Sequence, residues 1–402
     1  MRSPHRLRDR AGWLIPGLAG TLGLFASCGS RADFAPPDPI VPGEPSTEPD
    51  AHVAPIHGRA RLYAHYETIE TPDAGQADSV EDFQIRRADL TLSGSLLEHW
   101  SYRFKGDVRT GELDVQDLTI SYDTGFATLS MGQLGPIDEL TVPAYREFME
   151  GAGLEAAFAP QNQLGVYALH ESTAWTMAAG VFKGALDPRQ AEEGWTYAAR
   201  FTFAPSVPNG YLLHVGGYLS RRTGHSGEAV YAYSARSLLR TGERFVDTGA
   251  IADGDRLFGL ELSAGAGPVS FESQCAAVRA SIVQQGGSTA RFHGCYAAAL
   301  WFLTGESRNY GNGGFSRADI QSPVSEGGPG AWQAGVRFDT LDLEDGVIFG
   351  GSQRGWSFAL NWYLDDQFWL SANYSRTKIN VGVGEPLVTH GAAMRLHYQI
   401  RW

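Results

Sequence analysis

The sequence predicts an all-β protein, a sixteen-stranded antiparallel transmembrane β-barrel. Apolar and polar residues alternate along most of the chain from residue 56 onward, which is the period of a strand with one apolar and one polar face. Beyond residue 27 no stretch reaches the ~18 consecutive apolar residues of a membrane helix, and the mean hydropathy is −0.22. The 402 residues include 11% aromatic and 19% charged residues, which excludes a disordered polyelectrolyte.

The first 32 residues are expected to be a signal peptide for export. Four arginines precede the apolar run 11–27, and Ser30 and Ala32 place small residues at positions −3 and −1 of a cleavage site. The residues before Cys28 resemble a lipoprotein box, but with phenylalanine at the position where leucine is usual. The two alternatives are therefore cleavage after Ala32 and lipidation of Cys28.

Residues 33–55 contain seven prolines, five acidic residues and neither Lys nor Arg, so they are expected to be an extended periplasmic linker before the barrel domain, 56–402. The net charge of the chain is −13, and residues 1–32 contain five arginines and one aspartate, so the exported chain carries −17. An acidic chain of this kind is not expected to bind nucleic acid, whose phosphates require a basic surface.

Sixteen alternating segments follow. Two-residue turns join several of them at one end, and the longer connections 68–82, 135–161 and 223–253 fall at the other end. The connection 305–329 is an exception, because it is long but falls at the end with the short turns. An even number of strands with this arrangement is typical of bacterial outer-membrane barrels. The segments are 56–67, 83–97, 99–109, 114–123, 125–134, 162–171, 173–183, 193–204, 209–222, 254–266, 268–279, 291–304, 330–341, 352–364, 367–380 and 388–402.

A soluble or lipid-anchored β-sandwich that binds a ligand is the alternative, since its strands alternate as well. Aromatic residues near the strand ends favour the barrel, because outer-membrane barrels carry aromatic girdles at both membrane interfaces. The last segment alternates from Met394 to Trp402 at the C-terminus. This ending is similar to the signal that the barrel-assembly machinery reads, so we expect Trp402 to contact that machinery and the barrel to reside in an outer membrane of the Gram-negative type.

Eight short stretches occur in the same order as in a known family, over residues 58–402: IRRADLTLSG (85–94), WSYRF (100–104), EFME (147–150), LTGE (303–306), GAWQ (330–333), NWYL (361–364), SANY (371–374) and MRL (394–396). Together they resemble the phosphate-selective porins O and P. The resemblance implies a homotrimeric channel, surrounded by outer-membrane lipid, for passive diffusion of small hydrophilic solutes that include anions such as phosphate. It also implies that the third long loop, 135–161, folds into the lumen and constricts it, and that the connection 305–329 has a counterpart in the family.

Neither catalysis nor a cofactor is expected. The sequence contains no G-x-S-x-G, no H-E-x-x-H and no phosphate-cradling loop. The histidines show no metal-ligand spacing, so His214 and His397 are expected to line the lumen or to have a structural role.

Three arginines are the first candidates for anion contacts. The resemblance implies that Arg61, Arg86 and Arg87 contact anions at the constriction. Consecutive strand residues point to opposite faces, so Arg86 and Arg87 can both reach the lumen only through a bulge or at a loop end. Arg87 is the preferred candidate of the pair.

Three further cations are predicted to share one face of the third strand. Arg103, Lys105 and Arg109 would form a ladder with steps of ~7 Å. The alternative is that Asp107 and Asp117 neutralise this face.

The loop 135–161 departs from the phosphate-specific members of the family. Asp138 and Glu139 stand where those members place lysine and small hydroxyl residues, Glu147, Glu150 and Glu155 add negative charge, and Arg146 is the only cation. The sequence is therefore compatible with an anion channel, a weakly selective pore or a cation-preferring pore.

Cys275 and Cys295 are candidates for a disulfide. In a hairpin centred near Gln285 they lie directly opposite each other, on the face that carries Phe271 and Trp301. Directly opposed strand residues have suitable Cα separations, and export places the two thiols in an oxidising compartment. A shift of one residue in register would prevent the bond.

Overall fold

The computed structural model describes most of residues 56–402. The ranges outside the description are 1–55, 74–75, 110–111, 136–146, 160–161, 187–193, 206–210, 225–226, 241–242, 284–287, 312, 347 and 383–384. The predicted signal peptide and linker therefore lie outside the described residues, which all belong to the unit Asp33–Trp402.

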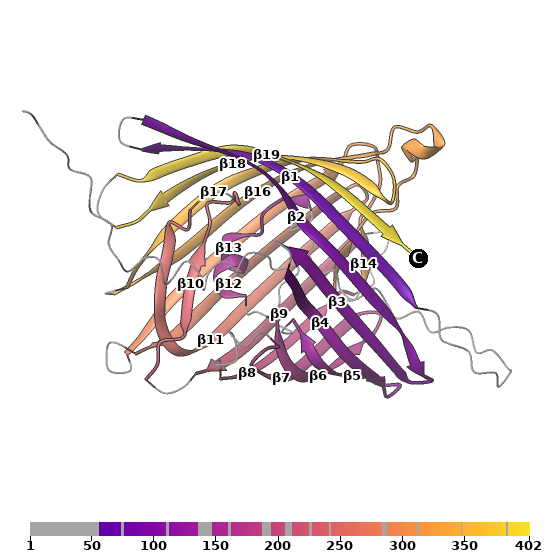
Figure 1. Ribbon diagram of the computed structural model, residues 1–402, viewed down its shortest axis with the longest axis horizontal. Helices are drawn as coiled ribbons and strands as arrows, with labels where there is room; N and C mark the ends of the chain where they lie inside the picture. The colour runs from indigo at the N-terminus through magenta and orange to yellow at the C-terminus, as the bar shows by residue number, and fades with distance from the viewer. Residues whose placement is uncertain are drawn as a thin grey trace, which may run out of the picture. The chain divides into compact units, whose positions relative to one another are not determined.

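Among the described residues, sixteen antiparallel strands pair in a closed ring, so the predicted barrel is confirmed (Figure 1). The strands, in ring order, are β1 (His57–Asp73), β2 (Gln76–Leu97), β3 (Trp100–Arg109), β4 (Glu112–Asp123), β5 (Thr128–Leu134), β6 (Gln163–Glu171), β7 (Trp175–Lys183), β8 (Trp195–Phe203), β9 (Tyr211–Thr223), β11 (Val246–Ala266), β12 (Val269–Ile282), β13 (Ser288–Phe302), β16 (Ala331–Asp345), β17 (Ile348–Tyr363), β18 (Phe368–Asn380) and β19 (Leu387–Arg401).

The ring closes between its first and last strands. β1 and β19 pair over twelve residues, from Arg59 opposite Arg401 to Glu70 opposite His390. The backbone N–H of Trp402 donates to the Gly58 carbonyl at 3.0 Å, and the Gly58 N–H donates to the Trp402 carbonyl at 2.9 Å. A Cβ at Gly58 would lie only 2.1 Å from the Trp402 indole, so glycine permits this close approach.

The faces of the strands are inverted relative to a soluble protein. On β12, Phe271 is 37% exposed on the outer face, whereas its neighbour Glu272 is fully buried on the inner face. Inward Gln274 is 1% exposed, and outward Val269 is 46% exposed. A ring with an apolar exterior and a polar interior is the arrangement of an outer-membrane barrel, and it argues against the β-sandwich alternative.

The prediction of a long loop at 68–82 is wrong, because β1 and β2 continue through most of it to Asp73 and from Gln76. Segments that extend beyond the membrane need no apolar face, so their alternation is weak in the sequence. The connection 223–253 also contains β10 (Tyr231–Ala235) and the start of β11. β10 pairs with β11 and lies outside the ring sequence.

Two connections carry further structure. The described part of the third long loop, 147–159, contains α3 (Gly153–Phe158) and lies inside the barrel. Leu154 and Phe158 of α3 are each 1% exposed and belong to a buried cluster with Tyr233 and Phe292. The connection 305–329 contains the hairpin β14 (Asn309–Gly311) and β15 (Gly314–Ser316), and the 3₁₀ turn η3 (Val324–Glu326).

Within the described part of the chain, no helix is both long and apolar enough to cross a membrane.

Candidate pore constriction

A β-bulge in β2 turns both predicted arginines inward. The ladder pairs Tyr63 with Arg87 and Ala64 with Ile85, so Arg86 is the extra residue between them. Arg86 is 4% exposed and Arg87 is 3% exposed, whereas Ile85 is 51% exposed on the outer face. A bulge of this kind allows consecutive residues to share a face, and the sequence required one here for both arginines to reach the lumen.

Arg61 lies beside Arg87 and shares a carboxylate with it. The Arg61 Nε donates to Asp89 at 3.0 Å, and its NH2 group lies 2.8 Å from Oδ2 of the same residue. Arg87 approaches that oxygen at 3.5 Å. Both guanidinium groups also lie over the ring of Tyr63, at 5.9 Å and 5.6 Å from its centroid. Two cations therefore surround one buried carboxylate and one aromatic face.

Glu150 of the inward-folded loop joins this wall. Its carboxylate accepts a hydrogen bond from Arg86 and lies 3.8 Å from Arg395 of β19. Arg395 also donates to the Met149 carbonyl at 2.9 Å. Burial alone would raise the pKa of Glu150, but the charges of Arg86, Arg240 and Arg395 outweigh burial and lower this pKa to about 2. The loop is thus held to β2 and β19 by a carboxylate that stays ionised.

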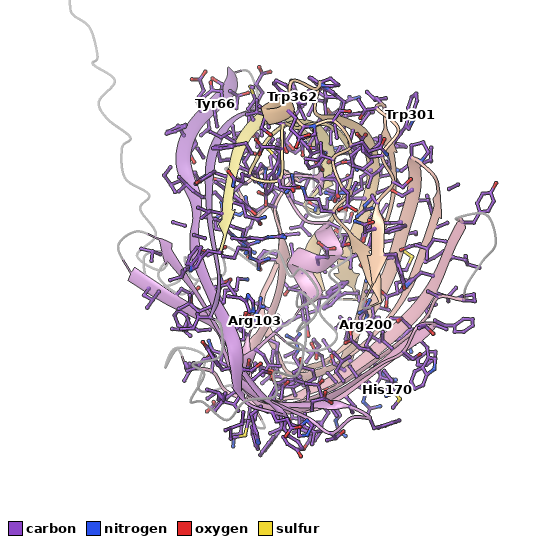
Figure 2. All side chains as sticks on the ribbon, turned by 90° about the vertical axis from the view of Figure 1, so that its right-hand side faces the viewer. Tyr66, Arg103, His170, Arg200, Trp301 and Trp362 are labelled. Atoms are coloured by element: carbon purple, nitrogen blue, oxygen red, sulfur yellow. A yellow bond between two sulfur atoms is a disulfide. The ribbon has the colours of Figure 1, made fainter. Side chains whose placement is uncertain are left out.

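The same loop is also anchored through its backbone to β16 and β17, which follow β18 and β19 around the ring. Arg337 of β16 donates to the carbonyls of Glu150 at 2.9 Å and Gly151 at 3.2 Å. Asp339 accepts from the Gly153 N–H at 3.1 Å, and Asn361 of β17 donates to the Glu147 carbonyl at 3.1 Å. The loop connects β5 and β6, which lie on the far side of the ring from β16 and β17, so the segment 147–159 extends across the lumen (Figure 2).

Glu155 of α3 titrates differently from Glu150. Burial raises the pKa of Glu155 to about 8, with Asp339 adding to the increase and Arg337 opposing it. At neutral pH most Glu155 side chains are therefore protonated, so this acid contributes little negative charge to the lumen.

The predicted ladder on β3 is partly paired. Arg103 donates to Asp117 of β4 at 3.1 Å, and Lys105 is 1% exposed opposite the same aspartate in the ladder. Asp107 is fully buried on this face and accepts from the Ala88 N–H at 3.2 Å. Arg109 ends β3, and its side chain lies outside the description.

A second segment, within the connection 305–329, contacts inward-facing wall residues at the end of the barrel with the short turns. Arg308 pairs with Glu272 of β12 at 2.6 Å and with Glu147 of the third loop at 3.5 Å. The β14–β15 hairpin reaches the wall of β8 and β9, where Arg200 donates to the Gly313 carbonyl at 3.0 Å and His214 is 2.6 Å from the Tyr310 hydroxyl. The long connection at the short-turn end thus contributes to the pore interior.

The remaining predicted residues divide into two groups. Asp138, Glu139 and Arg146 of the constriction loop lie outside the described residues. Cys275 and Cys295 are directly opposed in the β12–β13 ladder, with Cα atoms 4.1 Å apart, and form a disulfide on the outer face. The register is the one that a hairpin centred near Gln285 requires.

His214 and His397 point into the barrel, where they are 2% and 3% exposed. His397 stacks on Trp369 with ring centroids 4.5 Å apart. Within the described part of the chain, no group of three His, Cys, Asp or Glu residues is placed to hold a metal ion.

Three arginines at the constriction were not among the predicted site residues. Arg337 and Arg395 occupy inward positions of alternating strands, so periodicity alone could have placed them in the lumen. Arg308 lies in a connection without periodicity, and no sequence signal indicated its position. Figure 2 shows α3 inside the ring with Arg103 and Arg200 toward the interior, while Trp301 and His170 lie outside.

Comparison with known proteins identifies the family. The family model described as phosphate-selective porin O and P matches residues 57–400. The chain belongs to this family. It is therefore an outer-membrane channel protein, and family and fold are those of a channel rather than an enzyme.

Two relatives match most of this chain at low sequence identity. Porin O of Pseudomonas aeruginosa is 25% identical over 363 residues, which cover 79% of this chain and 80% of that protein. An uncharacterized protein of Caulobacter vibrioides is 29% identical over 327 residues, which cover 75% of this chain and 66% of that protein, slightly under two thirds of its length.

Solved outer-membrane proteins share the fold at low identity. A loop-deletion mutant of OmpT from Vibrio cholerae has a TM-score of 0.56 at 12% identity, with 86% of this chain and 100% of that chain covered. An anion-selective porin from Comamonas acidovorans has a TM-score of 0.54 at 10% identity, with 86% and 100% covered. The DcaP channel of Acinetobacter baumannii has a TM-score of 0.54 at 10% identity, with 86% and 97% covered.

Proposed function

We propose that this porin passes small hydrophilic anions by passive diffusion through a constriction formed by the β1–β3 wall and the segment 147–159. The observation that carries the proposal is the bulge in β2, which turns Arg86 and Arg87 into the lumen beside Arg61. Positive charge within a narrow, low-dielectric passage raises the local concentration of anions and favours their entry.

The charge near the bulge supports anion preference over cation preference. Inward basic residues outnumber inward acidic residues there, although ion pairs offset part of the difference. The described basic residues are Arg59, Arg61, Arg86, Arg87, Arg103, Lys105 and Arg395, and the described acidic residues are Glu67, Asp89, Asp107, Asp117 and Glu150.

The acidic residues of the loop weigh less against anions than the sequence suggested. Glu147 pairs with Arg308, and Glu150 pairs with Arg86, so each carries a fixed counter-charge. Glu155 has a pKa of about 8 because of burial, so it is mostly neutral at pH 7.

Phosphate is proposed as one of the permeant anions. Arg61 and Arg87 offer planar guanidinium groups on either side of one carboxylate, and guanidinium groups bind phosphate oxygens in pairs. Arg103 and Lys105 extend the basic surface along β3, and Arg109 would lengthen it further. Asp138, Glu139 and Arg146 are proposed to set the charge of the rest of the loop.

The test is ion selectivity in planar bilayers. The channel is expected to show an anion-selective reversal potential in a chloride gradient, and added phosphate is expected to reduce the chloride current by competing at the constriction. A cation-selective reversal potential would reject anion preference, and zero conductance would reject the open channel. A chloride current that is insensitive to phosphate would leave anion passage but reject a phosphate site.

Export and assembly are part of the same proposal. Residues 1–32 would serve as the signal peptide and 33–55 as a periplasmic linker before the barrel at 56–402. Trp402, which is 58% exposed, would contact the barrel-assembly machinery. The structure of Vibrio cholerae OmpT described as a trimer form supports a homotrimer for this chain, with outer-membrane lipid around its outer face.

A further inference from the structure

Four arginines form a row across the outer face of four adjacent strands. They are Arg221 of β9, Arg256 of β11, Arg279 of β12 and Arg291 of β13. The ladders pair Arg256 with Arg221 on one side and with Arg279 on the other, and they pair Arg279 with Arg291. All four side chains are exposed, and these strands lie side by side in Figure 1. We call this set the arginine row.

The arginine row lies at one edge of the apolar band. On β12, Arg279 is ten residues from Val269 at the opposite rim. At ~3.4 Å per residue and a strand tilt of ~40°, this corresponds to about 25 Å, the height of the apolar band in outer-membrane barrels. β9 ends only two residues beyond Arg221, at the end of the barrel that carries the longer connections. Because longer connections face the cell exterior in such barrels, the row lies at the outer-leaflet interface.

The arrangement is unfavourable without an anion. Like charges directly opposite each other on a sheet repel. None of the four guanidinium groups forms an ion pair with a described residue. Asp255 pairs with the inward Arg222, and Asp345 accepts from the backbone N–H of Arg291 at 2.7 Å rather than from its guanidinium group.

A pocket of about 380 Å³ lies at the row. Its lining includes the inward Arg222, the three row arginines Arg221, Arg256 and Arg279, and the hydroxyl residues Thr223, Ser281 and Thr289. Two carboxylates also line it: Asp255, which pairs with Arg222, and Asp253, which accepts from the Gly227 N–H at 3.2 Å. Guanidinium groups and hydroxyl groups together are the donors that recognise phosphate oxygens. Neighbouring strands are ~4.8 Å apart, so four of them span about 14 Å, which is enough for more than one phosphate.

We propose that the arginine row binds the phosphate groups of an anionic glycolipid headgroup in the outer leaflet. The acyl chains would lie on the apolar surface next to the row, where Leu219 and Phe258 are 57% and 54% exposed. This position favours a lipid over a soluble anion, because the row borders the membrane rather than the lumen. The lipid phosphates neutralise the opposed arginines and hold β9, β11, β12 and β13 to the surrounding bilayer.

The test is lipid retention by the full-length porin in detergent, measured by native mass spectrometry. The probes are lipid A with two phosphates and the same lipid after removal of its phosphates. We expect the diphosphorylated lipid to bind at least about tenfold more tightly, because charged hydrogen bonds to guanidinium groups are lost with the phosphates. Equal binding of the two lipids would overturn the proposal. Because this comparison uses the unmodified chain, it does not depend on the folding of a variant.

A double variant locates the site. Arg256→Gln with Arg279→Gln is expected to reduce lipid A binding about tenfold or more. The matched control is Arg354→Gln with Lys378→Gln, which removes two opposed cations at the same end of the barrel, on β17 and β18. An equal loss in the control would show general charge attraction and overturn a site at the row. Displacement of the lipid by inorganic phosphate alone, at equal ionic strength, would indicate a free-anion site and also overturn the proposal.

Discussion

Arginines inside the barrel and arginines on its outer face have different surroundings. Inside, Arg61 and Arg87 share Asp89, and Arg86 meets Glu150, so each cation lies against a fixed carboxylate. Outside, the arginine row is exposed and has no ion pair with a described residue. The interior thus combines positive charge with rigid partners, which suits weak and reversible contacts with a passing ion. The arginine row has no carboxylate partner among the described residues, so binding of an external anion lowers its electrostatic repulsion more than it would inside the barrel.

The largest expected loss of stability comes from removing an interior cation. Arg86→Ala leaves the partly buried Glu150 near Arg395 without its principal partner. Breaking a buried pair on one side costs about 3–5 kcal/mol, so the urea-unfolding midpoint in lipid vesicles is expected to fall markedly. Glu150→Gln combined with Arg86→Ala should recover part of this loss. A single variant as stable as the parent would show that the pair does not hold the loop.

Removal of the outer-face disulfide is expected to cost less stability than removal of Arg86. Cys275 and Cys295 are 20 residues apart, and closing a loop of this size stabilises a chain by about 3 kcal/mol in the chain-entropy model. The double substitution Cys275→Ala with Cys295→Ala should lower the unfolding midpoint without changing conductance. Reduction of the parent chain provides the matched control. A changed reversal potential would contradict the position of this disulfide on the outer face.

The anion selectivity of the channel is expected to depend on pH because of Glu155 in the interior loop. Because burial raises the pKa of Glu155 to about 8, this residue is mostly neutral at pH 7 and becomes negative as the pH rises through 8. Anion selectivity should therefore fall between pH 7 and pH 9, by the effect of a single charge. The Glu155→Gln variant should lose this step in the reversal potential, whereas a step of the same size in the variant would assign the titration to another group.

The smallest change in stability is expected from removing one arginine of the row on the outer face. Arg279→Ala removes one of the opposed like charges, so in detergent without lipid the thermal unfolding midpoint should stay unchanged or rise slightly. Addition of lipid A should stabilise the parent more than the variant, because a ligand that binds the folded state raises its apparent stability. A large loss of stability in detergent alone would mean that Arg279 has a partner within the protein.

The strands were predictable because their signal is local. Two-residue alternation identified all sixteen strands of the ring, and the hairpin geometry placed Cys275 opposite Cys295. Adjacent Arg86 and Arg87 indicated that β2 needs a bulge if both are to reach the lumen, and the structure has one between Ile85 and Arg87.

The contents of the lumen were less predictable. The pairing of Arg86 with Glu150 joins residues 64 positions apart, and the path of a loop leaves no periodic signal. The contact of Arg308 with Glu147 was not predictable for the same reason, because both residues lie in connections between strands. The arginine row depends on the register of four strands together, so no single segment indicates it.

The central claim is that lumenal arginines at the β2 bulge set the selectivity of the channel. The most direct measurement is the reversal potential of Arg87→Glu in a chloride gradient, compared with Lys183→Glu. Lys183 is exposed on the outer face at the end of β7, so its variant makes the same change in charge outside the lumen. The account predicts a shift toward cations for Arg87→Glu and none for Lys183→Glu. An unchanged potential in Arg87→Glu, or equal shifts in both variants, would contradict it.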